Sequence, residues 1–325
     1  MPHQRAFTAL LLATLILFVG GVVLGAELFH RHIIIPEHEP RRVHLDAYLR
    51  SPRAYVALGS SQMNMSLNID DPQFYNLAWR GEAIAEEWLR LRIVLRQSTN
   101  KPRQIFLEMN PPLMVHKGTA NPIFYYRDYI SPEDARTFRD SRINYQLPLL
   151  TQLAGEYRRD IPWLALRYTE GGSISPDPER LHFKIQDNGF SYNLIPDKTF
   201  PSPISRSTET LHVHPNFDYF FNLLIQEAQS HGIKVILVTT PMFPTLREAI
   251  SAGTWKETRQ YIDAACARFG LTYFDFSRFS DDAADFWNED HMSLAGAKRF
   301  GEFAHPILMP NAQILQNEQK YRPDR

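Results

Sequence analysis

The sequence has almost no cysteine and almost no net charge. Each of these features excludes some kinds of structure or partner. Cys266 is the one cysteine in 325 residues, so no disulfide can form within the chain. It stands in an apolar stretch of helical character, which favours a small buried side chain. The formal net charge is −1 with the two signs interspersed, so the chain has no sequence-independent attraction for nucleic acid. We therefore expect no nucleic-acid partner.

Charged side chains are also scarce near the N-terminus. Between residues 6 and 28 only Glu27 is charged, and a helix needs about 20 apolar residues to cross a bilayer core. A cleaved secretory signal would have a shorter apolar region and a small-residue cleavage site, for which residues 23–26 are a poor match. We favour an uncleaved membrane anchor over residues 1–30. Basic residues flank this segment on both sides, so charge alone does not orient it: Arg5, Arg31, Arg41 and Arg42.

The rest of the chain divides by composition into three parts. Residues 31–50 are polar and rich in His, Glu, Pro and Arg, which is typical of a solvated linker between the anchor and a domain. Residues 51–310 contain the apolar runs of a folded domain, and a chain that is 44% hydrophobic can bury a full core. Residues 311–325 are assigned to a tail.

Short apolar runs alternate with helical patterns along the domain. This alternation is typical of the α/β class and predicts a doubly wound, flavodoxin-like parallel sheet of five strands. The strands are expected at 54–58, 74–78, 103–109, 234–240 and 271–276, and the helices at 83–96, 217–230, 254–269 and 293–304. The pattern is lost from about 113 to 215, apart from short helical pieces such as 132–139 and 149–157. We interpret this region as a long insertion.

Two weaker clusters lie in this middle region. Its aromatic residues are candidates for stacking on sugar rings, although core packing explains them equally well: Phe124, Tyr125, Tyr126, Tyr129, Trp163 and Tyr168. His212 and His214 share one face if extended, but no carboxylate or cysteine stands at metal-ligand spacing from them. We therefore expect a polar loop rather than a metal site.

A serine motif directly follows the first expected strand. Gly59 ends the apolar run, and Ser60 and Ser61 follow it. In an open parallel sheet, ligands bind just outside the carboxyl ends of the strands, so these hydroxyls stand where chemistry is usually found. His291 stands in the loop between the last strand and the last helix, at the same edge. A neutral imidazole there could accept the proton of a serine hydroxyl, which is the minimum for nucleophilic catalysis.

Four short blocks in this order resemble those of the SGNH, or GDSL-like, hydrolase superfamily. They are Gly59-Ser60-Ser61, residues 76–81, Glu108-Met109-Asn110 and residues 288–291. The resemblance implies an SGNH-type fold with Ser61 as nucleophile and His291 as base. It also implies an oxyanion site made by the N–H groups of Ser61 and Gly81 and the side-chain amide of Asn110. Within the superfamily, the chain is most similar to membrane-anchored bacterial proteins of cell-envelope acyl transfer, such as the D-alanyl-transfer type.

One position departs from the superfamily pattern. Three residues before the histidine, where the superfamily has an aspartate, this chain has Asn288. An asparagine can orient the imidazole, but it does not stabilise the imidazolium as a carboxylate does. Asp290 could serve instead, although adjacent residues of an extended loop tend to point apart. Three possibilities stay open: a Ser-His pair helped by Asn288, a triad rebuilt with Asp290, or an inactive relative.

The resemblance implies a membrane-anchored serine esterase or O-acyltransferase that acts on acyl esters of a bacterial cell-envelope polysaccharide through an acyl-enzyme. It implies no metal and no nucleotide cofactor. The expected partners are an acylated glycan or lipid-linked substrate, the membrane, and a membrane protein. The expected place is the bacterial inner membrane, crossed once, with the domain in the periplasm or outside. The alternative is a catalytically inactive SGNH-like domain that binds a polysaccharide or a membrane partner during envelope assembly.

Overall fold

A single parallel sheet forms the centre of the computed structural model, which describes residues 2–29, 35–115, 126, 129–140, 183–193 and 208–310. Its five strands lie in the order β2-β1-β3-β6-β7, and every neighbouring pair is parallel. The strands are β1 (Tyr55–Leu58), β2 (Phe74–Asn76), β3 (Gln104–Glu108), β6 (Lys234–Thr239) and β7 (Thr272–Asp275). The predicted α/β fold with five parallel strands is confirmed.

The order of the strands locates the place where a ligand site is expected. From β1 the chain adds β2 on one side, and it then crosses to add β3, β6 and β7 on the other. The direction of winding therefore reverses at β1 and β3, and such a switch point opens a crevice at the carboxyl ends of the strands. The residues that follow these two strands are Gly59 to Ser61 and Met109 with Asn110.

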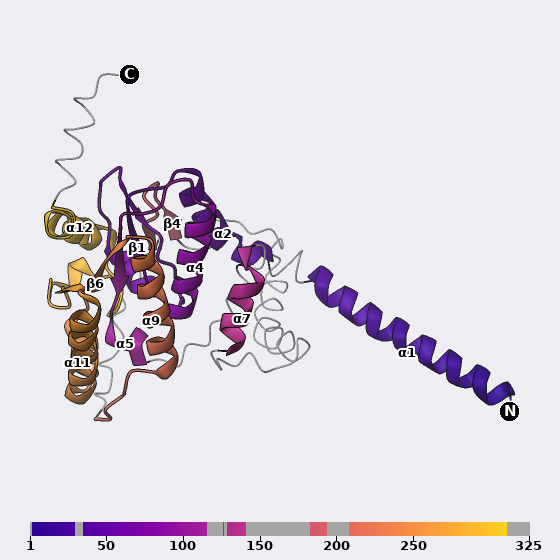
Figure 1. Cartoon of the computed structure of the whole chain (residues 1–325). Coiled ribbons are helices and arrows are strands. Elements are labelled where there is room, and N and C mark those ends of the chain that lie inside the picture. Colours follow the sequence, from indigo (N-terminus) through magenta and orange to yellow (C-terminus); the bar gives the residue numbers. More distant parts are fainter. Residues whose placement is uncertain are drawn as a thin grey trace, which may run out of the picture.

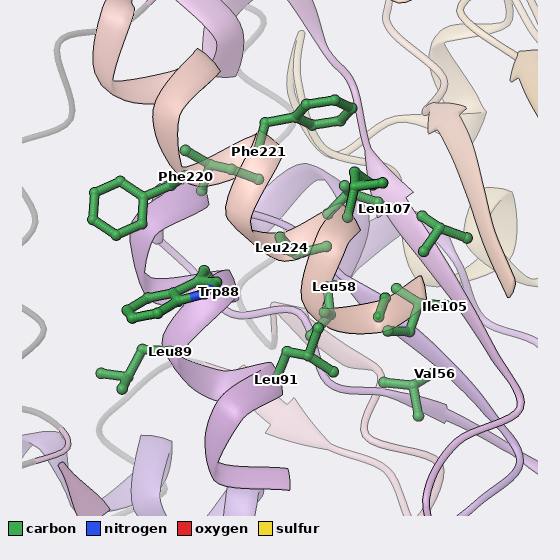
Figure 2. Close-up of a cluster of buried hydrophobic side chains, with 14 of the residues drawn as sticks. Val56, Leu58, Trp88, Leu89, Leu91, Ile105, Leu107, Phe220, Phe221 and Leu224 are labelled. Atoms are coloured by element: carbon green, nitrogen blue, oxygen red, sulfur yellow. The ribbon is translucent and has the colours of Figure 1, made fainter. Parts of the chain in front are cut away.

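Helices cover both faces of the sheet, because successive strand residues point to opposite sides. Val56 and Leu58 of β1 belong to a cluster that also contains Trp88 and Leu224. Figure 2 shows Val56, Leu58 and Leu224 where strands and helices meet, with Trp88 on the side of Phe220. Most of the helical residues of this cluster come from α2 (Ile35–Arg50), α4 (Ile84–Gln97), α9 (Pro215–Ser230) and α11 (Ala252–Phe269). In Figure 1, α4 and α9 lie side by side.

The opposite face is built mainly from the helices that flank the candidate site. Tyr55 and Ala57 of β1 belong to a second cluster, which also contains Met63 and Phe300. Met63 comes from α3 (Ser61–Ser66) and Phe300 from α12 (Leu294–Leu308), and these two helices pack against each other. The helix after the serine and the helix after the histidine therefore share one face of the sheet.

The four predicted helices of the domain are present as α4, α9, α11 and α12. Ser293 caps α12, because its hydroxyl accepts a hydrogen bond from the N–H of Gly296. Gly270 ends α11 in the left-handed conformation with φ +67°, which glycine adopts without steric cost. The short elements without a predicted counterpart include α3, α5 (Pro111–Val115), α10 (Pro244–Ala249) and the 3₁₀ turn η4 (Ala283–Asp285).

The structure differs from the sequence prediction in residues 35–50, which were expected to be a linker. They form α2, and the second half of this helix belongs to the core. Leu45 and Tyr48 are fully buried, and His44 lies against Trp79 with 5.0 Å between the ring centroids. Burial lowers the pKa of His44 to about 3. The folded domain therefore begins before residue 51.

The N-terminal helix α1 (Pro2–Phe29) lies apart from the α/β domain in Figure 1. Large apolar side chains in its middle are exposed, among them Leu10, Ile16, Leu17 and Phe18. Within the part of the chain that the structure describes, no helix combines the length and the apolarity that a membrane span requires. The membrane anchor over residues 1–30 stays a prediction.

The predicted insertion at 113–215 is described only in part. The helical piece expected at 132–139 is confirmed as α7 (Pro132–Asp140), and its Phe138 packs against Trp88. Tyr126 is buried and Tyr129 donates a hydrogen bond to Asp46, so the described aromatic residues fit the packing interpretation. An antiparallel hairpin of β4 (Phe183–Ile185) and β5 (Ser191–Asn193) also occurs. The helix expected at 149–157 and Phe124, Tyr125, Trp163 and Tyr168 lie outside the described residues.

Candidate active site

Ser61 is the first residue of α3 and follows β1 after a two-residue turn. The first N–H groups of a helix lack partners within the helix, so other acceptors must satisfy them. The Ser60 hydroxyl accepts from the N–H of Gln62 at 3.3 Å, and the Glu108 carboxylate accepts from the N–H of Met63 at 3.3 Å. The N–H of Asn64 donates to the carbonyl of Ser60 at 3.0 Å. Neither the Ser60 hydroxyl nor Glu108 accepts from the N–H of Ser61, the predicted oxyanion donor, within the described part of the chain. Ser61 itself is half-buried.

Glu108, the last residue of β3, anchors this serine turn. Its Oε2 accepts from the N–H of Ser60 at 2.6 Å, and its Oε1 accepts from the Ser60 hydroxyl at 3.0 Å. With Met63 and the amide of Asn110, which donates to Oε1 at 2.8 Å, four donors converge on one buried carboxyl group. Hydrogen bonds to an ionised carboxylate are stronger than those between neutral groups.

Gly59 is required by the close approach of β1 to β3 and α3. A Cβ atom at this position would lie 2.5 Å from Glu108 Oε2 and 2.7 Å from the Cβ atoms of Glu108 and Met63. Such distances are far inside van der Waals contact, so any side chain here would displace the carboxylate or the helix. The glycine of the first block therefore serves to admit Glu108 to the turn.

Asn110 occupies a different position from the one its predicted role requires. The residue is fully buried, and its amide nitrogen donates to Gln62 Oε1 at 2.7 Å, Glu108 Oε1 at 2.8 Å and Thr240 Oγ1 at 2.7 Å. Its Oδ1 accepts from the N–H of Thr240 at 2.9 Å. An amide has two N–H bonds, and acceptors within the protein use both. Asn110 thus joins the segments of α3, β3 and β6 through its side chain, and its predicted oxyanion role stays a prediction.

Gly81 lies beside the serine turn, because the segment after β2 continues along β1. The N–H of Trp79 donates to the carbonyl of Gly59 at 3.0 Å, and Gly81 follows two residues later. Gly81 is exposed and has φ +66°, so its backbone conformation favours glycine. Side chains hold the turn on both sides: Arg41 donates to the carbonyl of Arg80 at 2.9 Å, and buried Glu82 pairs with Arg90.

The His291 loop places the imidazole against two side-chain oxygens. Its Nδ1 lies 3.0 Å from Asn288 Oδ1 and 2.8 Å from Asp290 Oδ1. Asn288 Oδ1 also accepts from the N–H groups of Asp290 at 3.1 Å and His291 at 2.8 Å. Because Nδ1 faces acceptors, it carries the proton, and Nε2 is left with its lone pair. Nε2 is buried and has no hydrogen-bond partner among the described residues.

Contacts with the loop after β6 and with a buried cluster shared with α3 hold this loop beside the sheet, and a bridge closes its base. The N–H of Phe243, in the loop after β6, donates to the carbonyl of Glu289 at 3.1 Å. Phe286 and Met292 form an isolated antiparallel bridge at the base of the loop. Met292 also belongs to the same buried cluster as Met63 of α3. Among the described residues, no hydrogen bond joins Ser61 Oγ to His291 Nε2.

Burial changes the protonation of the carboxyl groups behind the serine turn. Burial raises the pKa of Glu108 to about 7, and its hydrogen bonds to Ser60, Met63 and Asn110 act in the opposite direction. Glu87 on α4 is fully buried, and neither of its oxygens has a hydrogen-bond partner in the described part of the chain. Burial, followed by the charge of Glu108, raises the pKa of Glu87 well above its usual value.

Of the predicted site residues, Ser61, Gly81 and Asn110 follow β1, β2 and β3, and Asn288, Asp290 and His291 lie together in the loop before α12. Their catalytic roles stay predictions. Sequence reasoning missed the supporting roles of Glu108, Gln62 and Thr240. One signal for Glu108 was present, since a carboxylate at the end of an otherwise apolar strand needs a partner when the strand is buried. The described residues contain no group of side chains that could hold a metal ion, and His214 caps α9.

No protein-family model matches the sequence, and no curated protein matches it. The SGNH resemblance rests on the four blocks alone.

Proposed function

We propose that the chain is a membrane-anchored serine esterase or O-acyltransferase of the SGNH type, with Ser61 as nucleophile and His291 as base. One observation carries this proposal. The Nδ1 atom of His291 is held by an amide oxygen and a carboxylate, while Nε2 is buried and unpartnered at the edge where Ser61 starts α3. An imidazole in this state is prepared to accept one proton and to stabilise the positive charge that follows.

The acyl-transfer steps follow from this arrangement. Ser61 Oγ attacks the carbonyl carbon of an acyl ester, and its proton passes to His291 Nε2. The tetrahedral intermediate collapses when the alcohol leaves with that proton, and the acyl group stays on Ser61. Water or an acceptor hydroxyl then attacks the acyl-enzyme, again with His291 as base. Hydrolysis and transfer differ only in this second nucleophile.

In this proposal, backbone N–H groups stabilise the negative charge of the oxyanion. The N–H groups of Ser61 and Gly81 are the candidates, and loss of one donor typically costs about 10²–10³ in rate. Asn288 and Asp290 share the support of the imidazolium: Asn288 contributes orientation, and Asp290 contributes negative charge 2.8 Å from Nδ1. Among the described residues no hydrogen bond joins Ser61 Oγ to His291 Nε2, and catalytic hydrogen bonds are often long without substrate.

The substrate and the place of action rest on the resemblance and the N-terminal segment. An acylated polysaccharide or lipid-linked substrate of the bacterial envelope suits an enzyme attached to the outer side of the inner membrane. Residues 6–28 with one charge, and the exposed leucines of α1, support attachment through this segment.

A serine-reactive fluorophosphonate tests the chemistry without knowledge of the substrate. The full-length chain in detergent is used, because a cut at residue 45 would remove the buried part of α2 that contains Arg41 and His44. We expect covalent labelling of the wild type and none of Ser61→Ala. Ser66→Ala is the matched control, because it makes the same change on the same helix and Ser66 has no partner at the site. Labelling of Ser61→Ala at the wild-type rate would overturn the assignment.

The alternative function is a binding domain without catalysis. It is favoured by Asn288 at the position of the superfamily aspartate and by the absence of a Ser61–His291 hydrogen bond among the described residues. A wild-type chain that is folded but unlabelled, and that still binds an envelope polysaccharide after Ser61→Ala, would establish this alternative.

A further inference from the structure

We infer that Glu108 is a positioning residue of the candidate site: its carboxylate fixes the Gly59-Ser60-Ser61 turn, and through that turn it sets the place of the Ser61 hydroxyl and N–H group. The part of this inference that concerns reactivity rests on the proposed function. The part that concerns the geometry of the turn does not, and the two parts are tested separately below.

The hydrogen bonds of the Glu108 carboxylate hold the backbone before and after Ser61. Glu108 holds the backbone of the residue before Ser61 and the backbone N–H two residues after it, at 2.6 Å from Ser60 and 3.3 Å from Met63. Both donors point into the same Oε2 atom. The 59–60 and 62–63 peptide units, one residue removed from Ser61 on each side, are therefore tied to one point on β3. A displacement of about 1 Å in a reacting group can cost about 10² in rate, so such a tie matters for activity.

The second oxygen joins the turn to the neighbouring strands. Oε1 accepts from the Ser60 hydroxyl at 3.0 Å and from the Asn110 amide at 2.8 Å. Asn110 in turn contacts Thr240 at the end of β6 through both its nitrogen and its oxygen. Because β6 precedes the loop that binds Glu289, this chain of hydrogen bonds connects the serine half of the site to the histidine half.

The ionised form of Glu108 is the form that these contacts need. All four neighbours donate hydrogen bonds, and a protonated carboxyl group would use one of its oxygens as a donor itself. Among the described residues, the buried carboxyl group of Glu87 on α4 is close enough for its charge state to interact with that of Glu108. The facing residues of α3 and β6 are uncharged: Ser60, Gln62, Met63 and Thr240.

Glu87 provides a matched comparison within the same molecule. Glu87 and Glu108 are both fully buried glutamates with raised pKa values, and they lie close enough for their charges to interact. Only Glu108 makes hydrogen bonds to the serine turn. A change from glutamate to glutamine therefore alters the same chemical group at both positions, but only the change at Glu108 affects the contact with Ser60.

The main experiment measures the rate of fluorophosphonate labelling for full-length wild type, Glu108→Gln and Glu87→Gln in detergent at pH 8. We expect Glu108→Gln to reduce the rate about tenfold to 10²-fold, and Glu87→Gln to stay within about twofold of the wild type. Glu108→Asp, which keeps the charge, should recover part of the loss. Equal rates for Glu108→Gln and the wild type would overturn the role in reactivity.

A pH series separates positioning from a loss of stability. Protonation of Glu108 imitates the glutamine, so the ratio of wild-type to Glu108→Gln rates should fall toward one as the pH decreases through about 7. Both proteins are measured in the same buffers, so the ratio reports only what the substitution changes. A ratio that is constant from pH 5 to pH 8 would contradict the proposed dependence on the ionised carboxylate.

Hydrogen exchange tests the geometry even if the proposed function is wrong. In the wild type, the N–H groups of Ser60 and Met63 are bonded to Glu108 and should exchange slowly. Glu108→Gln should speed exchange in peptides that cover residues 59–66 by about tenfold or more, and Glu87→Gln should not. An unlabelled wild type with this exchange result would overturn the proposed function and keep the positioning role. Unchanged exchange in Glu108→Gln would overturn the positioning role itself.

Discussion

The serine half and the histidine half of the candidate site are held in place in opposite ways. Ser60 is bonded to Glu108, which is 48 positions away in sequence, and Asn110 is bonded to Thr240, which is 130 positions away. His291 is held by Asn288 and Asp290, both within three positions of it. The serine half therefore depends on the assembled sheet, and the histidine half depends on one loop.

This difference predicts how each half responds to mutation. A network of long-range contacts forms only when β1, β3 and β6 are aligned, so changes there affect stability and activity together. A local loop can lose a side chain without disturbing the core, so changes there affect activity alone. The comparison fails if a change in the network lowers activity alone, or if a change in the loop also lowers stability.

The largest effect on activity outside Ser61 is expected for His291→Ala. In the proposed mechanism the imidazole accepts the Ser61 proton, so its removal should lower fluorophosphonate labelling by about 10³-fold or more. The melting temperature should change little, because Nε2 has no partner and the contacts of Nδ1 lie within the loop. His231→Ala, at the exposed end of α9, is the control and should label normally. A His291→Ala rate within about tenfold of the wild type would remove the histidine from the mechanism.

A smaller effect is expected from the two residues that support His291. Asn288→Ala removes the acceptor of two backbone N–H groups and of Nδ1, so the imidazole loses its orientation and labelling should fall about 10²-fold. Asp290→Asn keeps the shape and removes one charge, and about tenfold is expected. Asn288→Asp should be at least as active as the wild type, since it restores the aspartate of the superfamily pattern. A larger loss for Asp290→Asn than for Asn288→Ala would show that Asp290 is the main partner of the histidine.

The sheet was predictable because each of its strands is a short apolar run. β3 and β6 contain Ile105, Leu107, Val235 and Leu237, all buried, and continuous apolar runs are typical of strands covered on both faces. The predicted ends of these strands also gave the positions of Gly59, Asn110 and His291 at one edge. Local sequence thus contained the information for the sheet and for the residues that follow its strands.

Other features depend on contacts that local sequence does not encode. The buried face of α2 contains Arg41 and His44 beside Leu45 and Tyr48, so its pattern does not distinguish a core helix from a polar linker. Helix α3 has six residues, which is too short for a helical period to show. The position of the Asn110 amide depends on Thr240, and no pattern near Asn110 reveals that strand β6 places an acceptor there.

The smallest expected effect is on the pH dependence of stability, and it comes from buried carboxyl groups outside the His291 loop. Burial raises the pKa values of Glu86 and Glu108 to about 7 and that of Glu87 well above its usual range. Between about pH 4.5 and 7 the folded state therefore holds protons that the unfolded state has released. Stability contributed by these groups is complete below the unfolded pKa and is lost as pH rises through the folded one.

We therefore expect the melting temperature of the full-length chain in detergent to fall from pH 5 to pH 8, by roughly 5 °C or more. Glu87→Gln cannot release a proton, so its melting temperature should fall less steeply over this range. Glu302→Gln, on the exposed side of α12, should keep the wild-type slope. Calorimetry at four pH values between 5 and 8 measures both slopes. If Glu87→Gln and the wild type have the same slope, Glu87 is ionised in the folded state, and a partner for its carboxylate must exist near α4.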